Sequence, residues 1–324
     1  MIKGNKKLFD NYKFVDLFAG IGGFHLALSS YGAKCVFASE WDKEAANTYK
    51  INFGIEPKGD ITIIDEKDIP PHDIICGGFP CQAFSISGKQ KGFNDTRGTL
   101  FFDIARIVNH HKPKILFLEN VKNITKHNDG DTMKVILTTL DELGYNVFHK
   151  VLNSSNYGLP QNRERVFFIG FRKDIGVNEF KFPEPVNEIV SVKDILEEDP
   201  KEVKVINRPD INIYKSFSNL FNHKPNRPLQ IGKVNKGGQG ERIYDINGHC
   251  ITLSAYGGGP GAKTGLYLIN NEIRKLTPRE CARAQGFPDS FILNEKTTQS
   301  YKQFGNSVSV NVLQHILETI HKHL

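Results

Sequence analysis

The sequence lacks any apolar stretch that approaches the roughly 20 residues of a membrane-spanning helix. Residues 1–13 are basic but contain no apolar core of the kind found in secretory signals. Cysteine is scarce, with only Cys35, Cys76, Cys81, Cys250 and Cys281. An odd, scattered set without CxxC spacing argues against a disulfide framework and against a structural zinc site. These absences predict a cytoplasmic protein without a membrane segment and without a metal site.

The 324 residues carry a formal net charge of +6, and 39% of them are hydrophobic. This composition is ordinary for a globular protein with one large and one smaller domain. Residues 201–275 contain 12 Lys and Arg but only 5 Asp and Glu, so this segment is more positive than the chain as a whole. Such a segment can bind a polyanion by releasing counterions, or it can simply solubilise a surface. The charge alone leaves both readings open.

Short apolar runs rich in strand-forming residues alternate with helix-like segments in the first half of the chain. Strands are expected at 14–18, 35–39, 73–76, 115–118, 145–152 and 166–171, and helices at 24–28 and 99–109. This alternation predicts an α/β fold, a Rossmann-like and mostly parallel sheet with helices on both faces. Ligands of such folds bind beyond the carboxyl ends of the strands.

The pattern changes after about Pro185, where the chain becomes basic, irregular and rich in glycine. We therefore expect a larger domain formed by residues 1–193 and 278–324, and a smaller, irregular β-rich domain formed by 194–277. The final segment, 304–324, is predicted to be an amphipathic helix that returns to the larger domain. Asn306 or Ser307 is expected near its start, where a polar cap belongs.

A glycine-rich turn follows the first expected strand. Gly20, Gly22 and Gly23 allow the backbone to come close to a ligand, but a dinucleotide fingerprint would need glycine where His25 stands. Glu40 closes the second strand about 20 residues later, where an acidic side chain binds ribose hydroxyls. The alternative is a tight turn without a ligand.

Two further residues strengthen the nucleotide interpretation. Trp41 offers a flat apolar face to an adenine ring, and Asp60 is a candidate partner for the adenine amino group. The alternative for Trp41 is a core position. Together with Glu40, these residues favour a nucleotide-like cofactor at this edge of the sheet.

Cys81 follows the third strand directly, on a loop restricted by Pro80. A strand end exposes a nucleophile, and a thiolate needs cationic neighbours such as Lys89, Lys91 and Arg97. The alternative is an inert buried cysteine, which suits Cys35 and Cys76 better because both lie within apolar runs.

Glu119 ends the adjacent apolar strand, where a carboxylate is costly unless it is paired or functional. Arg163 and Arg165 alternate at the start of a later strand, so both guanidiniums can face one side. That side can hold a substrate carbonyl and a carboxylate. The alternative for the arginines is a pair of surface salt bridges.

Seven segments, in this order, resemble the motifs of bacterial C5-cytosine DNA methyltransferases of type II restriction–modification systems. They are FVDLFAGIGGF, GGFPCQAFSISGKQKGF, RGTLFFDIARI, LENVKN, QNRERVFFIGF, LTPRECARAQGFPDSF and YKQFGNSV. The motifs are long and cover nearly the whole chain, so the resemblance is specific.

The resemblance implies methyl transfer from S-adenosylmethionine to C5 of a cytosine, without a metal. Cys81 would attack C6, Glu119 would hold N3, and Arg165 would contact O2 with support from Arg163. The resemblance places the following residues at the cofactor: Phe18, Gly20, Gly22, Gly23, Glu40, Trp41, Asp60, Ile61, Pro80, Leu100, Asn306 and Ser307.

The family extrudes the cytosine from double-stranded DNA, and the loop 85–98 would close over it. The residues expected at the DNA are Ser87, Lys89, Arg97, Gln239, Glu241, Arg242, Thr252, Tyr256, Gly257 and Gly258. Arg242 suits bidentate contact with guanine, and Glu241 can accept from a cytosine amino group. The target is expected to be GCGC or another GC-centred site.

Two other functions remain open at this point. One is an RNA cytosine methyltransferase of the same fold, acting on tRNA; the basic, glycine-rich segment after Pro185 argues against it. The other is a DNA-binding module without catalysis, which the presence of Cys81, Glu119 and Arg165 argues against. We expect a monomer whose functional partners are double-stranded DNA and a cognate restriction endonuclease.

Overall fold

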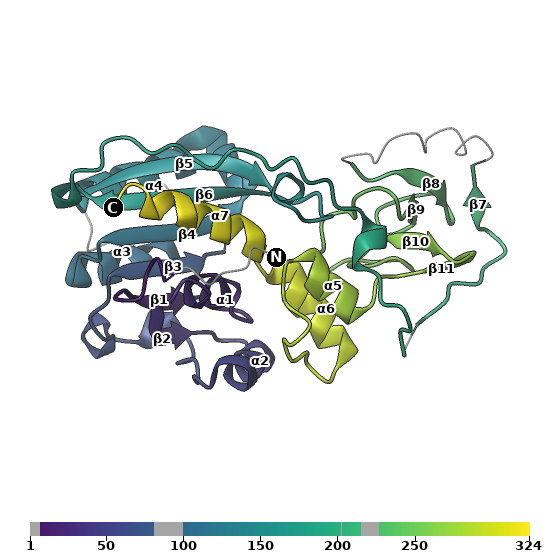
Figure 1. Cartoon of the computed structure of the whole chain (residues 1–324), viewed down its shortest axis with the longest axis horizontal. Helices are drawn as coiled ribbons and strands as arrows, with labels where there is room; N and C mark the ends of the chain where they lie inside the picture. Colours follow the sequence, from purple (N-terminus) through teal and green to yellow (C-terminus); the bar gives the residue numbers. More distant parts are fainter. Residues whose placement is uncertain (1–6, 81–99, 202, 215–226) are drawn as a thin grey trace. The chain divides into compact units, whose positions relative to one another are not determined.

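The computed structural model describes residues 7–80, 100–201, 203–214 and 227–324. The chain divides into two compact units (Figure 1). The first, called here the α/β unit, includes the described residues within 7–152, 164–183 and 313–324, and the second unit includes those within 153–163 and 184–312. The functional boundaries expected at 193/194 and 277/278 remain a prediction, because compactness does not assign a task to a segment.

A six-stranded sheet forms the centre of the α/β unit, in the order β2-β1-β3-β4-β6-β5. Its strands are β1 (Lys13–Leu17), β2 (Lys34–Ser39), β3 (Ile74–Gly78), β4 (Ile115–Val121), β5 (Tyr145–Asn153) and β6 (Glu164–Arg172). The strands β2, β1, β3 and β4 run parallel, whereas β6 is antiparallel to β4. All six strands expected from the apolar runs are confirmed within a few residues.

Side chains alternate between the two faces of this sheet, and different helices cover each face. Val15 and Leu116 belong to a core cluster with α3 (Leu100–His111) and α4 (Asp131–Glu142). Phe117, on the opposite face, packs edge-on against Phe24 of α1 (Gly23–Ser29). Helices therefore lie on both faces (Figure 1), which confirms the α/β expectation.

The second unit contains a smaller sheet in the order β11-β10-β9-β8-β7. Its strands are β7 (Asn212–Ile213), β8 (Gln230–Lys233), β9 (Arg242–Asp245), β10 (Leu266–Ile269) and β11 (Glu272–Arg274). Ile231, Ile243 and Leu266 lie in its own apolar core. Helices α5 (Pro278–Ala284) and α6 (Thr297–Asn306) follow this sheet. The strands are short, as expected for an irregular β-rich domain.

One expectation about the end of the chain is wrong. Residues 304–324 do not form a single helix that starts near Asn306 or Ser307, because α6 ends at Asn306 and α7 begins only at Val310. Ser307 is extended, with φ −72° and ψ 164°. Asn306 and Ser307 lie at the carboxyl end of α6, because the side chains of Arg163 and Gln285 donate to the last carbonyls of that helix. Local sequence does not reveal those donors.

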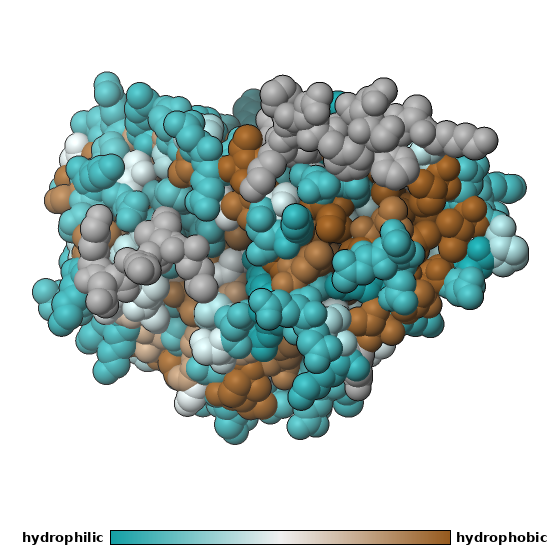
Figure 2. All heavy atoms as spheres, turned by 45° about the vertical axis from the view of Figure 1, so that its right-hand side comes forward, coloured by the Kyte–Doolittle hydropathy of each residue, from teal (hydrophilic) through white to brown (hydrophobic). Residues whose placement is uncertain are grey.

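The last helix, α7 (Val310–His321), contributes residues from Leu313 onward to the α/β unit. There Gln314 donates to Ser30 Oγ at 2.9 Å, and Tyr31 donates to Glu318 at 3.2 Å. In the described part of the chain, no helix is both long and apolar enough to span a bilayer. On the face drawn in Figure 2, hydrophilic residues cover much of the surface and apolar patches lie between them.

Candidate functional site

The glycine turn after β1 has an unusual backbone. Phe18, Gly20 and Gly22 all have positive φ, at 54°, 55° and 86°. A Cβ at Gly22 would lie 2.2 Å from the ring of Phe53, so this glycine permits close packing. A Cβ at Gly20 would meet nothing within 4 Å. The space beside Gly20 is therefore open to a ligand.

Glu40 holds this turn in place from the end of β2. Its Oε2 accepts from the backbone N–H of Gly20 at 2.8 Å, and its Oε1 accepts from that of Asp42 at 2.8 Å. Burial raises the pKa of Glu40, and the N–H groups of Asp42 and Gly20 oppose that rise. The carboxylate thus joins the two strand ends at which the cofactor residues were expected.

Trp41 is 80% exposed, although it is the one tryptophan of the chain. It therefore does not occupy the core, which was the alternative interpretation of this residue. It directly precedes Asp42, which caps α2 (Lys43–Phe53) by accepting from Glu44 and Ala45. A rigid turn beside a free aromatic face, with open space at Gly20, fits an adenine nucleoside group.

The other expected cofactor residues lie in both units. Phe18 and Leu100 pack partly buried against the core cluster that contains Ile61. Asp60 caps the short helix Ile61–Ile63 by accepting from the backbone of Thr62. Pro80 is exposed at the end of the described segment, and Asn306 is exposed at the end of α6. Ser307 is buried next to it in the second unit.

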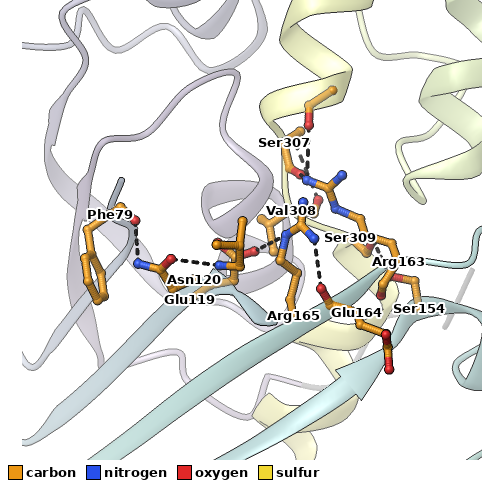
Figure 3. Close-up of polar contacts among 12 residues, drawn as sticks. Phe79, Glu119, Asn120, Ser154, Arg163, Glu164, Arg165, Ser307, Val308 and Ser309 are labelled. Atoms are coloured by element: carbon orange, nitrogen blue, oxygen red, sulfur yellow. Dashed lines mark hydrogen bonds and ion pairs between the residues drawn. The ribbon is translucent and has the colours of Figure 1, made fainter. Parts of the chain in front are cut away.

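Glu119 and Arg165 form an ion pair between neighbouring strands (Figure 3). Arg165 Nε lies 3.0 Å from Glu119 Oε1, and the two side chains are only 16% and 11% exposed. The antiparallel register of β4 and β6 brings them together, since Val121 faces Arg165 and Glu119 faces Phe167. A planar guanidinium at this distance holds the carboxylate of Glu119 in one orientation.

Two residues next to this pair could not be recognised from the sequence as part of the site. A Cβ at Gly78 would lie 2.9 Å from Glu119 Oε2, so glycine leaves room for the carboxylate. Asn120 donates through Nδ2 to the carbonyl of Phe79 at 2.8 Å. It therefore anchors the backbone two residues before Cys81, which lies outside the described residues.

Ser87, Lys89 and Arg97 also lie outside the described residues. The four described cysteines, Cys35, Cys76, Cys250 and Cys281, are free and buried. Burial raises the pKa of each of these thiols, to about 12 for Cys35. Because the thiolate is the reactive form, none of the four suits a nucleophile.

Arg163 is placed differently from Arg165. It is buried, and its guanidinium donates to the backbone carbonyls of Leu253, Gly305 and Ser307. Figure 3 shows the contact between Arg163 and Ser307. It therefore binds the protein backbone, and its expected support of Arg165 at the substrate remains a prediction. Alternation along a strand predicted a common side but not these partners.

Most residues expected at DNA are exposed in the second unit, namely Gln239, Arg242, Thr252, Tyr256, Gly257 and Gly258. Tyr256 is 73% exposed, which leaves its ring free for a partner. The hydroxyl of Thr252 donates to the carbonyl of Asn162 at 2.6 Å. Glu241 is held within its own loop, where it accepts from Asn235 and from the backbone of Gly238 at 2.8 Å each. These bonds lower the pKa of Glu241.

The two glycine-rich loops of this unit interlock. A Cβ at Gly240 would lie 2.3 Å from the carbonyl oxygen of Gly258. The N–H of Gly261 donates to the carbonyl of Gly240 at 2.7 Å. The loops 237–241 and 257–261 therefore form one surface, whose geometry requires glycine at the contact.

No group of three or more His, Cys, Asp or Glu residues within the described ranges is arranged to hold a metal ion. The site described so far consists of a glycine turn, an exposed tryptophan and a buried Glu–Arg pair.

Comparison with known proteins identifies the family. Residues 12–322 match the family described as C-5 cytosine-specific DNA methylase. The chain is 54% identical to the type II methyltransferase M.HhaI of Haemophilus parahaemolyticus, covering 99% of this chain and 97% of that protein. It is 44% identical to M.HpaII of Haemophilus parainfluenzae, covering 96% and 90%.

Among solved structures, a proposed DNA modification methyltransferase encoded within an Escherichia coli prophage is similar, with a TM-score of 0.69 and 25% identity. The match covers 96% of this chain and 99% of that one. The match of sequence and fold along almost the whole chain shows that the protein is a cytosine-5 methyltransferase of the C-5 cytosine-specific DNA methylase family.

Proposed function

We propose that the protein transfers a methyl group from S-adenosylmethionine to C5 of a cytosine flipped out of double-stranded DNA. The observation that carries this proposal is the Glu119–Arg165 pair at the end of β4. Gly78 of β3 lies opposite Glu119 in the sheet, and Cys81 follows β3 by three residues. The proposed nucleophile and the proposed N3 partner thus belong to adjacent strand ends.

The chemistry follows from the weak nucleophilicity of cytosine C5. The Cys81 thiolate adds to C6, which makes C5 enamine-like, while Glu119 in its acid form donates a hydrogen bond or its proton to N3 and stabilises the negative charge that develops on the ring. Arg165 contacts O2 and keeps Glu119 oriented. S-adenosylmethionine, when bound, would supply an electrophilic methyl group on sulfur, which C5 takes as the carbon–sulfur bond breaks and S-adenosylhomocysteine is left. A general base then removes the C5 proton, the Cys81–C6 bond breaks, and the cysteine leaves as thiolate.

Gly20, Glu40, Trp41 and Asp60 would hold the cofactor, and Asn306 and Ser307 would complete its site. The open space beside Gly20 and the exposed ring of Trp41 support this assignment. Glu40 keeps both features in one turn through its bond to the Gly20 N–H.

Trp41 provides a direct test, because the chain has one tryptophan. Adding S-adenosylhomocysteine should quench or shift the intrinsic tryptophan fluorescence, since an adenine ring would stack on an exposed indole. Trp41→Ala should weaken binding in calorimetry by about three- to tenfold, the amount expected from an aromatic contact of about 1 kcal/mol. Tyr256→Ala, which removes another exposed ring, should leave cofactor affinity unchanged. Saturable binding that leaves the Trp41 emission unchanged would contradict the assignment.

In the second unit, Gln239, Arg242, Thr252, Tyr256 and the loop 257–261 would contact the duplex. The surplus of positive charge in residues 201–275 supports a polyanionic partner. The target is GCGC or another GC-centred site. As a monomer in the cytoplasm, the protein would protect host DNA from a cognate restriction endonuclease.

Bisulfite sequencing tests substrate and target together. An unmethylated plasmid is incubated with the purified protein and S-adenosylmethionine, and we expect protected cytosines at one short GC-centred motif. A reaction lacking the cofactor is the control. If tRNA is methylated as well as or better than duplex DNA, the RNA enzyme is the correct interpretation. Cofactor binding without methylation of either nucleic acid would point to a binding module.

A further inference from the structure

Arg163 lies where separate segments of the second unit meet. Its Nη1 donates to the carbonyl of Leu253 at 3.1 Å, and its Nη2 donates to the carbonyls of Gly305 at 3.1 Å and Ser307 at 2.6 Å. The residue is only 2% exposed. Because a guanidinium presents its donors in a rigid plane, these bonds fix the spacing between residue 253 and residues 305–307.

Gly305 brings the same two segments into direct contact. A Cβ at this position would lie 2.2 Å from the backbone nitrogen of Ala255 and 2.3 Å from the carbonyl carbon of Ser254. Only glycine allows the end of α6 to approach this backbone so closely. The contact is independent of the arginine, and it joins the same segments.

The end of α6 is capped by side chains from elsewhere in the chain. Gln285 Nε2 donates to the carbonyl of Phe304 at 2.8 Å, and Arg163 binds the carbonyl of Gly305. The last carbonyls of a helix have no partner within the helix, and a cation is favourable there. Arg163 therefore caps the carboxyl end of α6, which ends at Asn306.

Residues with two different proposed tasks flank this junction. Thr252, next to Leu253, is proposed to contact DNA. Asn306 and Ser307 are proposed to contact the cofactor. A displacement of the Ser307 carbonyl by the cofactor would act on the guanidinium that also holds the Leu253 carbonyl.

We propose that Arg163 is a positioning residue that couples cofactor binding to DNA binding. This inference rests on the proposed function. Arg163 acts through backbone carbonyls and does not touch the cytosine. Since coupling between two binding sites is reciprocal, each ligand strengthens the binding of the other by the same factor.

The test is the Kd of an unmethylated target duplex with and without S-adenosylhomocysteine, which has no methyl group to transfer. For the unsubstituted protein we expect the cofactor product to tighten DNA binding by about fivefold or more. Arg163→Lys should reduce this factor to about twofold or less, because one ammonium cannot reproduce the planar fork. Its Kd for DNA alone should stay within about threefold.

Arg165→Lys is the matched control, since it makes the same substitution two residues away at a side chain paired with Glu119. It should keep the full coupling factor even though it slows methylation. An unchanged factor in Arg163→Lys would overturn the proposal, and so would the absence of coupling in the unsubstituted protein.

Hydrogen exchange on the unsubstituted protein decides the question if Arg163→Lys does not fold. The amides of Leu253 and Ser254 donate to Gln161 Oε1 and to the carbonyl of Lys263, both at 3.0 Å. S-adenosylhomocysteine alone should slow exchange in a peptide that covers 252–256. Unchanged exchange at saturating ligand would refute coupling. A protein that binds neither ligand would instead refute the proposed function.

Discussion

Replacing Cys81 by alanine is expected to lower kcat for DNA methylation by about 10⁴-fold or more, the scale of losing a covalent nucleophile. Without the thiolate, C5 of cytosine remains too poor a nucleophile to take the methyl group. The buried cysteines cannot substitute, because burial raises the pKa of their thiols. Incorporation of a radiolabelled methyl group into target DNA measures the loss.

Cys281→Ala is the matched control, because Cys281 is buried in the second unit. It should retain kcat within a few-fold while losing some thermal stability. Duplex DNA with 5-fluorocytosine at the target should form a denaturant-resistant adduct with the unsubstituted protein but not with Cys81→Ala, since fluorine cannot leave as the proton does. Normal methylation by Cys81→Ala would refute covalent catalysis.

Glu119→Ala should lower kcat by about 10²- to 10⁴-fold, the range for loss of a positioned acid or hydrogen-bond partner. Arg165→Met should cause a comparable loss, because it leaves a mostly buried carboxylate without its guanidinium. Glu119 and Arg165 would act together on the pyrimidine ring, so that removing either one removes the effect of both. The double variant should therefore be no more than a few-fold slower than the slower single variant.

Single-turnover methylation by the two single variants and the double variant gives the full cycle. Lys122→Met removes an exposed ion pair, the one with Glu164 at 2.9 Å, and should leave kcat within about twofold. If the losses from Glu119→Ala and Arg165→Met multiply in the double variant, the residues act independently. The proposed joint role would then be wrong.

The strands of the large sheet could be predicted from the sequence, because each strand is marked by a short run of neighbouring residues. Runs such as 14–18 and 115–118 are short, apolar and bounded by glycine or charge, and each becomes a strand of the α/β unit. The exposure of Trp41 also agrees with a residue available to a ligand. The proposed role of Cys81 still rests on its place after β3 and on the family resemblance.

Contacts between distant residues could not be predicted. The Arg163 guanidinium binds carbonyls about 90 and 140 residues further along the chain, and no local pattern encodes that. The same bonds explain why Asn306 ends a helix although its polarity suggested a start. Asn120 was missed for a related reason, since its partner is the backbone carbonyl of Phe79.

The interlocked loops of the second unit, at which we propose that DNA is read, would limit how this protein can change its target during evolution. Any side chain at Gly240 would meet the Gly258 carbonyl, so backbone changes in one loop disturb the other at once. Arg242 and Tyr256 are exposed and lie next to these loops, one directly after 237–241 and the other directly before 257–261, so they can vary without that cost. New specificities should therefore arise by substitution of Arg242 and Tyr256 while the glycines of the two loops are kept. Insertions in these loops should be selected against.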